Sequence, residues 1–508
     1  MKKLFLINLL ICYTFFGAVG CSGSDDAGTT KTASIIFNSI ANDDVIDVTE
    51  RKRPNHTVSG SATGGYIAAG DGVIVLVNGT AYNTTIVSGG AFSVDVATSD
   101  LIADNTIDVV ITSKNKGNNV RTTASKQITI EEVQARTFVH PGLLVKQSDF
   151  DRIKIKVNAG AEPWMSGWNR LINNAHSQSN YTPNPVVKLI RGGSSTEEPE
   201  PDNYSVAFND AAAAFQLAIR WKVTGNDIYA QRAIFVLNSW ARTCTSISGN
   251  SNKALGAGIY GYQFANAAEI MRDYSGWTTS DFDKFKKWMV DVFYPINKAF
   301  IDTHWNTCIS HYWANWDLAN ISSILAIAVL TDDTDKYDFA MNYLKTGAGN
   351  GNLNKAVYFI HPDGLGQLQE SGRDQGHALL CVGMLGEIAQ MAYSQGDDIF
   401  GYDDNRILKG AEYSAKYNVA NLSVPFQPYN NCDNVNHTVV SPDARGNVRP
   451  IWDLLYYHYV IRKGLSSPYL KLASEANGSI EGGGGDYGPN SGGYDSLGFG
   501  TLLYAIDE

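Results

Sequence analysis

Two segments of the sequence concentrate residue types that could do acid–base and charge-stabilising chemistry. One begins at His304 and includes the phrase HYWANWDLAN; the other begins at His361 and ends, at His377, with the phrase GLGQLQESGRDQGH. Four of the nine His residues lie between positions 304 and 377. Imidazole, guanidinium, amide and phenol groups therefore occur together just before apolar helical runs, which favours a functional site. The alternative is a buried network in which His and Trp side chains satisfy one another.

The second phrase places a carboxylate, a guanidinium and an imidazole at spacings that a helix would bring onto one face. Glu370, Arg373 and His377 stand at positions i, i+3 and i+7, and residues so spaced are neighbours on a helix. Gly372 and Gly376 weaken a helix, so a turn is the alternative for part of this stretch. Glu370 could orient the fork of Arg373 toward a carboxylate; the alternative is a structural ion pair.

The two phrases, with the acidic tail at residues 395–405, resemble the alginate lyase superfamily of (α/α) toroid enzymes. Among its branches the sequence is most similar to polysaccharide lyase family 38, and the resemblance covers roughly residues 140–505. It implies cleavage of alginate or a related glucuronate polymer by β-elimination. It also implies that no redox or organic cofactor is obligatory, so we expect none.

This elimination explains why such residue types would be needed. The enzyme removes the proton on C5 of the uronate and expels the oxygen on C4, but that proton is too weakly acidic while the neighbouring carboxylate keeps its charge. One well-placed charge-stabilising donor is worth about 10²–10³-fold. General acid–base help from Tyr or His is worth roughly 10²–10⁴-fold, so charge neutralisation matters as much as the base.

The resemblance assigns some of these roles and leaves others open. In the mannuronate lyases an Asn-His pair opens a helix, and an Arg and a Tyr seven residues apart follow later. Asn315 matches the Asn and Arg373 the Arg, which implies that both neutralise the substrate carboxylate. Trp316 stands at the position of the His and Leu380 at that of the Tyr, so the base and the acid are not assigned.

Nearby imidazoles and phenols supply the remaining candidates. We expect His311 or His377 to be the base and Tyr358 the acid, although either His could be structural. Trp313 and Trp316 could stack on sugar rings, although a Trp at helical spacing is more often part of a core. The substrate-binding residues that we expect are Asn306, Tyr312, Trp313, Trp316, Gln369 and Glu370.

Other functions fit parts of the same pattern. A lyase acting on glucuronan or another uronate glycan would use the same chemistry. A non-catalytic surface lipoprotein would bind glycan without cutting it. A glycoside hydrolase on the same toroid would need two carboxylates about 5–10 Å apart around the glycosidic bond, and its candidates are Asp317, Asp363, Glu370 and Asp374.

Composition limits the partners of the chain. Its 508 residues carry a net charge of −11, which argues against nucleic-acid binding because phosphate contacts need clustered Lys and Arg. A local basic site for an acidic polysaccharide remains compatible with this charge. The 26 Tyr and 10 Trp residues indicate core packing or, alternatively, sugar stacking in a cleft. We expect a monomer.

The N-terminus has the pattern of a lipoprotein export signal over residues 1–20. Lys2 and Lys3 precede a mostly apolar run that is too short for a comfortable membrane span, and AVGC at positions 18–21 resembles a lipobox. We therefore expect a lipid on Cys21, a polar tether over residues 21–32, and anchoring to a bacterial outer membrane, facing the cell surface or the periplasm.

Behind the tether, the pattern changes to short alternating runs typical of strands. Residues 72–77 and 82–87 flank an Asn-Gly turn and predict a hairpin, and residues 91–96 and 106–111 predict further strands. About seven strands over residues 33–135 favour a β-sandwich. Residues 58–96 resemble bacterial immunoglobulin-like repeats, which implies a spacer, with carbohydrate binding as a weaker alternative.

From residue 136 to 508 the pattern is mainly helical. Helix pairs with short turns indicate stacked antiparallel hairpins, and their closure into an (α/α) toroid is what the resemblance implies. Asp210 is the expected N-cap and Gly225 the expected end of one helix. The Gly-rich stretch 482–493 predicts a loop. Helices are predicted at residues 147–157, 211–223, 227–241, 255–273, 280–299, 313–330, 334–345, 377–394, 405–418 and 451–462.

Four cysteines remain beyond the signal, and they show no paired spacing typical of a zinc site. We expect buried thiols, with one disulfide as the alternative. The acidic pairs at residues 397–398 and 403–404 could bind calcium, but a solvated turn is the favoured interpretation, so no metal is expected. The cysteines in question are Cys244, Cys308, Cys381 and Cys432.

Overall fold

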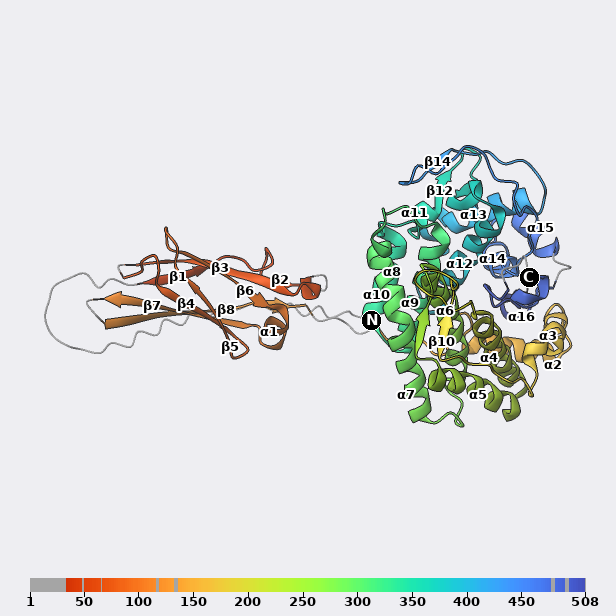
Figure 1. Cartoon of the computed structure of the whole chain (residues 1–508), viewed down its shortest axis with the longest axis horizontal. Helices are drawn as coiled ribbons and strands as arrows, with labels where there is room; N and C mark the ends of the chain where they lie inside the picture. Colours follow the sequence, from red (N-terminus) through yellow and green to blue (C-terminus); the bar gives the residue numbers. More distant parts are fainter. Residues whose placement is uncertain are drawn as a thin grey trace, which may run out of the picture. The chain divides into compact units, whose positions relative to one another are not determined.

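The computed structural model describes residues 33–47, 50–64, 66–115, 118–131, 136–476, 480–488 and 493–507. They form two compact units, and the second begins at Arg136 (Figure 1). The predicted signal peptide, Cys21 and the tether lie outside the described residues. Within the described part, every helix is too short or too polar to cross a membrane.

The first unit is a sandwich of two antiparallel sheets. Side chains alternate between buried and exposed along β3, as expected for a strand with one face on a core. The inner faces share a core that includes Val58, Val75, Phe92 and Val109. One sheet has the order β1–β3–β6 and the other β5–β4–β7–β8. The strands are β1 (Ser34–Phe37), β2 (Val45–Ile46), β3 (Asn55–Thr63), β4 (Gly72–Val77), β5 (Thr80–Thr85), β6 (Ala91–Ala97), β7 (Thr106–Asn115), β8 (Asn118–Gln127) and β9 (Thr129–Ile130), with one short helix, α1 (Thr98–Ala103).

The predicted hairpin around the Asn-Gly turn is confirmed. Val77 pairs with Thr80 in the β4–β5 ladder, so Asn78 and Gly79 form a two-residue loop. Their φ angles are +50° and +73°, as the favoured hairpin turn requires at both positions. The other two predicted strands are also confirmed, within β6 and β7.

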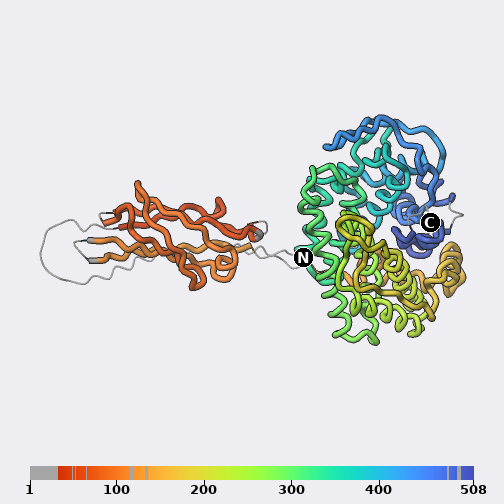
Figure 2. Tube along the Cα trace, viewed as in Figure 1, coloured from red at the N-terminus to blue at the C-terminus, as the bar shows by residue number. Residues whose placement is uncertain are grey.

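The second unit is built from helices that follow one another around a ring. The chain passes from yellow through green to blue around this unit (Figure 2), and α16 near the C-terminus contacts α3. Buried helices such as α6 and α9 alternate with amphipathic ones such as α5 and α7. The main helices are α2 (Gln147–Asn158), α3 (Trp164–Asn173), α4 (Ser205–Thr224), α5 (Asp227–Thr243), α6 (Asn252–Met271), α7 (Thr279–Trp288), α8 (Tyr294–Thr303), α9 (Ala314–Leu330), α10 (Thr334–Thr346), α11 (Leu353–Ala356), α12 (Gln375–Ser394), α13 (Tyr402–Asn418), α14 (Trp452–Tyr456), α15 (Pro468–Ala476) and α16 (Gly500–Tyr504).

Short strands and turns connect these helices at the level where the buried helices begin. Two of them, β12 and β13, form a small antiparallel ladder that leads directly into the turn before α12. Another pair, β14 and β15, forms a hairpin in the long segment after α13. The bounds are β10 (Lys188–Ile190), β11 (Ser246–Ser248), β12 (Val357–Ile360), β13 (Gly366–Leu368), β14 (Tyr429–Asn430) and β15 (Asn436–His437).

Helix α4 differs from its prediction at one end. Gly225 ends it in a left-handed conformation, as predicted. Asp210 is not the N-cap, because the helix begins at Ser205 and Asp210 lies inside it. Its buried carboxylate accepts hydrogen bonds from the Tyr181 hydroxyl (2.7 Å) and the Trp240 indole (2.6 Å). The Asp210 carboxylate therefore bonds to side chains from other parts of the fold and not to the free N–H groups at the start of a helix.

The helix predicted over residues 280–299 is interrupted. A π-helical turn, Met289–Phe293, separates α7 from α8. Pro295 follows in the first turn of α8, where its missing N–H is tolerated. A second π turn, Tyr457–Arg462, ends the helix predicted over residues 451–462.

The expectation of four buried thiols is wrong for two of the cysteines. Cys308 and Cys432 form a disulfide, with Cα atoms 6.2 Å apart. Cys244 and Cys381 are buried thiols, as expected. The disulfide partners are 124 residues apart in sequence, and only the fold brings the segment before α9 against the segment after α13.

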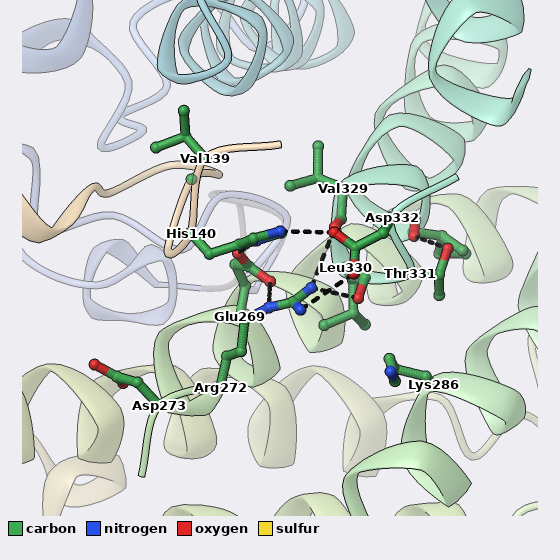
Figure 3. A network of polar contacts seen from close by, with 12 residues as sticks. Val139, His140, Glu269, Arg272, Asp273, Lys286, Val329, Leu330, Thr331 and Asp332 are labelled. Atoms are coloured by element: carbon green, nitrogen blue, oxygen red, sulfur yellow. Dashed lines mark hydrogen bonds and ion pairs between the residues drawn. The ribbon is translucent and has the colours of Figure 1, made fainter. Parts of the chain in front are cut away.

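A network of ion pairs links the start of the helical unit to the ends of two buried helices (Figure 3). The imidazole of His140 lies between Glu269 of α6 (2.5 Å) and Asp332 after α9 (2.7 Å). Arg272 pairs with the same two carboxylates. Each carboxylate thus contacts two cationic groups, and the segment from Arg136 is held against α6 and α9.

Candidate active site

The two polar segments singled out in the sequence meet at the beginnings of α9 and α12. Glu370 lies in a 3₁₀ turn, Gln369–Gly372, between β13 and α12, and its carboxylate is completely buried. One oxygen, Oε1, accepts from the backbone N–H (2.8 Å) and the side-chain amide (2.6 Å) of Asn315. The other, Oε2, accepts from Arg373 Nη1 (2.9 Å). A single carboxylate therefore joins the two residues expected to neutralise a substrate.

Of the two backbones considered for Glu370, Arg373 and His377, the structure has the turn over the first part and not one continuous helix. The 3₁₀ turn ends before Arg373, and Asp374 is extended and caps α12 by accepting from the backbone N–H of His377. The three side chains nevertheless meet, because Arg373 contacts Glu370 on one side and His377 on the other. A capped turn followed by a helix produces the same neighbours as one helix would.

The contacts of His377 fix the orientation of its ring. Arg373 Nη2 lies 3.3 Å from Nε2 of His377, and a guanidinium can only donate, so Nε2 accepts. The opposite nitrogen, Nδ1, faces Asp374 Oδ2 at 2.6 Å and donates to it. His377 therefore orients Arg373, and its lone pair is occupied by that contact.

A fourth group completes the surroundings of the buried carboxylate. The Sγ of Cys381 lies 3.3 Å from Glu370 Oε1. Burial, and then the Glu370 carboxylate, hold the pKa of Cys381 well above its usual range. The thiol stays protonated and donates, so every contact on Glu370 comes from a donor.

The β14–β15 hairpin brings a residue to this cluster that the sequence did not indicate. The ring of His437 lies 5.3 Å from that of Trp313, and the Arg373 guanidinium lies 5.4 Å from the same Trp313 ring. Burial and the charge of Arg373 lower the pKa of His437. Only its isolated position in a Gly-, Asn- and Pro-rich segment could have drawn attention to it, since no spacing links it to the two motifs.

Two phenols meet at the hairpin, one of them, Tyr429, within its first strand. The rings of Tyr358 and Tyr429 meet edge-on at 5.2 Å. Tyr358 accepts from Gln367 Nε2 (3.0 Å) and donates to the carbonyl of Gln427. Burial raises the pKa of Tyr358 to about 12 and also raises that of Tyr429. Both hydroxyls are therefore protonated near neutral pH, the form that a general acid needs.

Three buried polar atoms in this region, Asn315 Oδ1, Ser371 Oγ and His437 Nε2, have no hydrogen-bond partner among the described residues. The Gln369 oxygen accepts from the backbone N–H of Ala314 (3.0 Å), and its amide donates toward the Tyr429 hydroxyl. Unpartnered buried polar atoms are costly, but they also occur elsewhere in the described part of the chain, so they do not by themselves mark a ligand site.

The remaining predicted residues lie around this cluster. His311 pairs with Asp433 in the hairpin turn (2.7 Å), and both side chains are about 40% exposed (41% and 39%). Tyr312 and Trp316 pack with each other (4.8 Å) and with Phe300, so core packing accounts for them. Asn306 is exposed in a turn before α9. Substrate contacts for these residues stay predictions.

The carboxylates considered for a hydrolase have structural partners. Buried Asp317 contacts His304 (2.9 Å) and accepts from the Tyr343 hydroxyl (3.1 Å) and the backbone N–H of Gly351 (2.9 Å). Glu370 and Asp374 are engaged as described above. Asp363 is exposed in the turn before β13 and accepts from the Leu365 N–H. These contacts favour structural roles for all four.

Two hollows of the helical unit lie at other residues. One of about 550 Å³ is bounded by Asn169, Arg170 and Asp486. A neighbouring hollow of about 600 Å³ is bounded by His176 and Tyr494 and shares Asp486 with the first. Their amides and aromatic rings suit a sugar, but neither includes the Glu370 cluster.

Comparison with solved structures places the helical unit in a known fold. A single-residue variant of alginate lyase A1-III of Sphingomonas species A1, complexed with a tetrasaccharide, is 17% identical; the match covers 74% of this chain and 98% of that one, with a TM-score of 0.50. An alginate lyase from Bacteroides ovatus is 14% identical over 73% of this chain and 100% of that one, with a TM-score of 0.48. The expected (α/α) toroid is confirmed by the first match.

The first unit has a separate likeness. A bacterial immunoglobulin-like domain from the M. primoryensis ice-binding adhesin is 45% identical, with coverage of 20% of this chain and 100% of that one and a TM-score of 0.19. No curated protein matches the chain significantly. The sequence model of the alginate lyase family matches residues 170–423, which is half of the chain and includes Asn315, Glu370 and Arg373. The chain therefore belongs to the alginate lyase family.

Proposed function

We propose that this protein is a polysaccharide lyase that cleaves a uronic-acid polymer, with alginate or polymannuronate as the preferred class, by β-elimination. The product would carry an unsaturated uronate at its new non-reducing end. The observation that carries the proposal is the clamp of Asn315 and Arg373 on one buried carboxylate. It fixes an amide and a guanidinium side by side before any substrate arrives, and preorganised donors of this kind stabilise developing negative charge.

The clamp leaves donors available to a substrate. Arg373 donates from one nitrogen to Glu370 and from another to His377. A guanidinium has five N–H donors, and the Arg373 side chain is 28% exposed, so other donors can reach a substrate. The Asn315 amide gives one N–H to Glu370, but its side chain is fully buried, so the exposed donors of the clamp are those of Arg373. These donors could bind the uronate carboxylate and spread the charge that forms when C5 loses its proton.

His437 is the imidazole best suited to take that proton. A base must be neutral, and the pKa of His437 is lowered by burial and by Arg373. Its Nε2 has no partner, whereas His377 uses its lone pair to hold Arg373 and His311 lies in an exposed ion pair. We therefore assign His377 a positioning role and prefer His437 to both earlier candidates as the base.

The acid that protonates the leaving oxygen would be a phenol. Tyr358 remains the candidate, because its raised pKa keeps the proton in place at neutral pH. Its hydroxyl donates to the Gln427 carbonyl, so that contact would break when substrate enters. Trp313, held between Arg373 and His437, would offer its face to a sugar ring.

Absorbance near the ultraviolet edge tests this function directly, because elimination creates a conjugated product and hydrolysis does not. The protein would be incubated with purified polymannuronate, polyguluronate and glucuronan. We expect absorbance to rise on at least one of them and Arg373→Ala to lower the rate about 10²–10³-fold. Arg242→Ala, at a surface ion pair with Asp281, is the matched control. New reducing ends without absorbance would refute the lyase proposal.

We also propose that the mature protein is lipid-anchored through Cys21 at the outer membrane, with the first unit as an immunoglobulin-like spacer. The export pattern of residues 1–21 supports the anchor. The two-sheet sandwich of three and four strands supports the spacer. Cys21→Ala should move the protein from the membrane to the soluble fraction; retention in the membrane fraction would rule the anchor out.

A further inference from the structure

The β14–β15 hairpin is too small to hold its own shape. Each strand has two residues, and isolated two-stranded hairpins are marginal in water even when longer. The segment around it, from residue 419 to 450, has little regular structure. Something else must fix the positions of Tyr429 and His437, which form one cross-strand pair of this hairpin.

The turn of the hairpin is tethered covalently to the segment before α9. Cys432 lies in that turn and forms the disulfide with Cys308. Beside it, the backbone N–H of Cys432 donates to Ser310 Oγ (2.9 Å), and Asp433 pairs with His311. The ion pair is exposed and is therefore worth little by itself, so the disulfide is the strongest part of this attachment.

The other side of the hairpin, with His437 and Tyr429, packs against the proposed site. A Cβ atom on Gly372 would lie 2.5 Å from His437 Cβ, so only glycine allows the hairpin to come this close to the turn that carries Glu370. The rings of His437 and Tyr429 lie 5.3 Å and 6.1 Å from Trp313. The hairpin thus spans the distance from the disulfide to the site.

We propose that the Cys308–Cys432 disulfide is a positioning group for the reaction, holding the hairpin so that His437 and Tyr429 stay against Trp313 and Arg373. This inference rests on the proposed lyase function. Both cysteines are exposed and so accessible to a dithiol. One thiolate of dithiothreitol attacks a sulfur, the other cysteine leaves as a thiolate, and ring closure yields oxidised dithiothreitol and two cysteine thiols.

Reduction of the full-length protein tests the inference by kinetics. We expect kcat on the cleaved polymer to fall between about tenfold and a hundredfold, because small misplacements of a catalytic group have effects of that size. KM should change less, since Arg373 is held by Glu370 and His377 rather than by the hairpin. The Cys308→Ser/Cys432→Ser variant should be equally slow and should not respond to dithiothreitol.

A pH profile separates positioning from general loss of structure. Freed from its burial, His437 should recover a higher pKa, so the acidic limb of the kcat/KM profile should move to higher pH in the reduced protein and in the double variant. Thermal unfolding of the same samples shows whether the fold persists at the assay temperature. A slower enzyme with an unmoved acidic limb would overturn the inference in favour of a structural disulfide.

Hydrogen exchange of peptides spanning residues 429–437 gives a readout that does not need activity. Reduction should speed exchange there and leave peptides within α12 unchanged. Unchanged exchange in the hairpin overturns the inference. An oxidised protein that cleaves no uronate polymer overturns the proposed function, whereas an active protein whose kcat is indifferent to reduction overturns only the role of the disulfide.

Discussion

At the scale of single residues, the central feature is one buried carboxylate, Glu370, that binds both groups proposed to neutralise the substrate. Asn315 and Arg373 were predictable because the sequence resembles a family motif at those positions, and the pairing of Glu370 with Arg373 followed from their spacing. His437 was not predictable, because its role depends on a hairpin 60 residues beyond the second motif. Sequence spacing predicts which residues are neighbours within one turn of a helix, but it does not predict contacts between segments that are far apart in the sequence.

Replacing the organising carboxylate should separate its two roles. In Glu370→Gln, one carboxylate oxygen becomes an NH2 group that must face either Arg373 or the side of Asn315 and Cys381, all of which donate at this site. We expect a loss of about 1–3 kcal/mol in stability from the unsatisfied buried groups, and a fall in kcat/KM of about 10²-fold as Arg373 loses its orientation. Denaturant unfolding and steady-state kinetics measure the two. A destabilised variant with undiminished kcat/KM would make Glu370 purely structural.

The proposed base makes a second prediction at this scale. Burial and Arg373 lower the pKa of His437, so its neutral, proton-accepting form should persist below the ordinary histidine pKa of about 6.5. The acidic limb of kcat/KM should accordingly lie below that value, and His437→Gln should lower kcat by about 10²–10⁴-fold and abolish the limb. The same limb in His437→Gln would assign it to another group, and His377→Gln is the matched comparison.

At the scale of elements, periodicity predicted most helices to within a few residues and missed what tertiary contacts decide. Asp210 looks like a helix cap in sequence, yet it is a buried acceptor for Tyr181 and Trp240. The sequence also did not predict the π turn before α8, because the one extra residue that a π turn inserts into a helix does not disturb the pattern of apolar residues. The disulfide Cys308–Cys432 could not be chosen from four cysteines, because its partners lie on different connecting segments.

The attachment of the first segment to α6 and α9 predicts a pH dependence. Burial opposes a charge on His140, but Glu269 and Asp332 outweigh it and raise its pKa, although Arg272 nearby acts in the opposite sense. A raised folded-state pKa gives stability that is fully present below the unfolded pKa of about 6.5 and lost as pH rises through the folded value. His140→Gln should therefore destabilise the protein more at pH 6 than at pH 9, as measured by thermal unfolding. Equal losses at both pH values would contradict this.

At the scale of the whole molecule, the residues proposed for catalysis and the predicted export signal belong to different parts of the chain. Every residue proposed for catalysis lies in the unit that begins at Arg136, which has a hydrophobic core of its own. The sandwich has a separate core. The sequence predicted a strand-rich first part and a helical second part. The closure of the helices into a ring was predicted only from the family resemblance, because helical periodicity does not show which helical hairpins contact one another.

This division predicts that the helical unit is sufficient for chemistry. A chain beginning at residue 136 should keep kcat and KM on soluble polymer within about twofold of the longer protein, as expected for a domain with its own core. Circular dichroism would verify folding before the kinetic comparison. A folded but slow truncated chain would mean that the first unit contributes to the site.

In the proposed reaction, Arg373, with Asn315, acts by cancelling the negative charge of the substrate carboxylate. Methyl esterification of the uronate removes that charge chemically, so it should make Arg373 nearly dispensable. We predict that Arg373→Ala slows cleavage of the free-acid polymer about 10²–10³-fold but slows cleavage of the methyl-esterified polymer less than about tenfold, as read by absorbance of the unsaturated product. An equal loss of rate on both polymers would show that Arg373 does not act through the charge of the carboxylate.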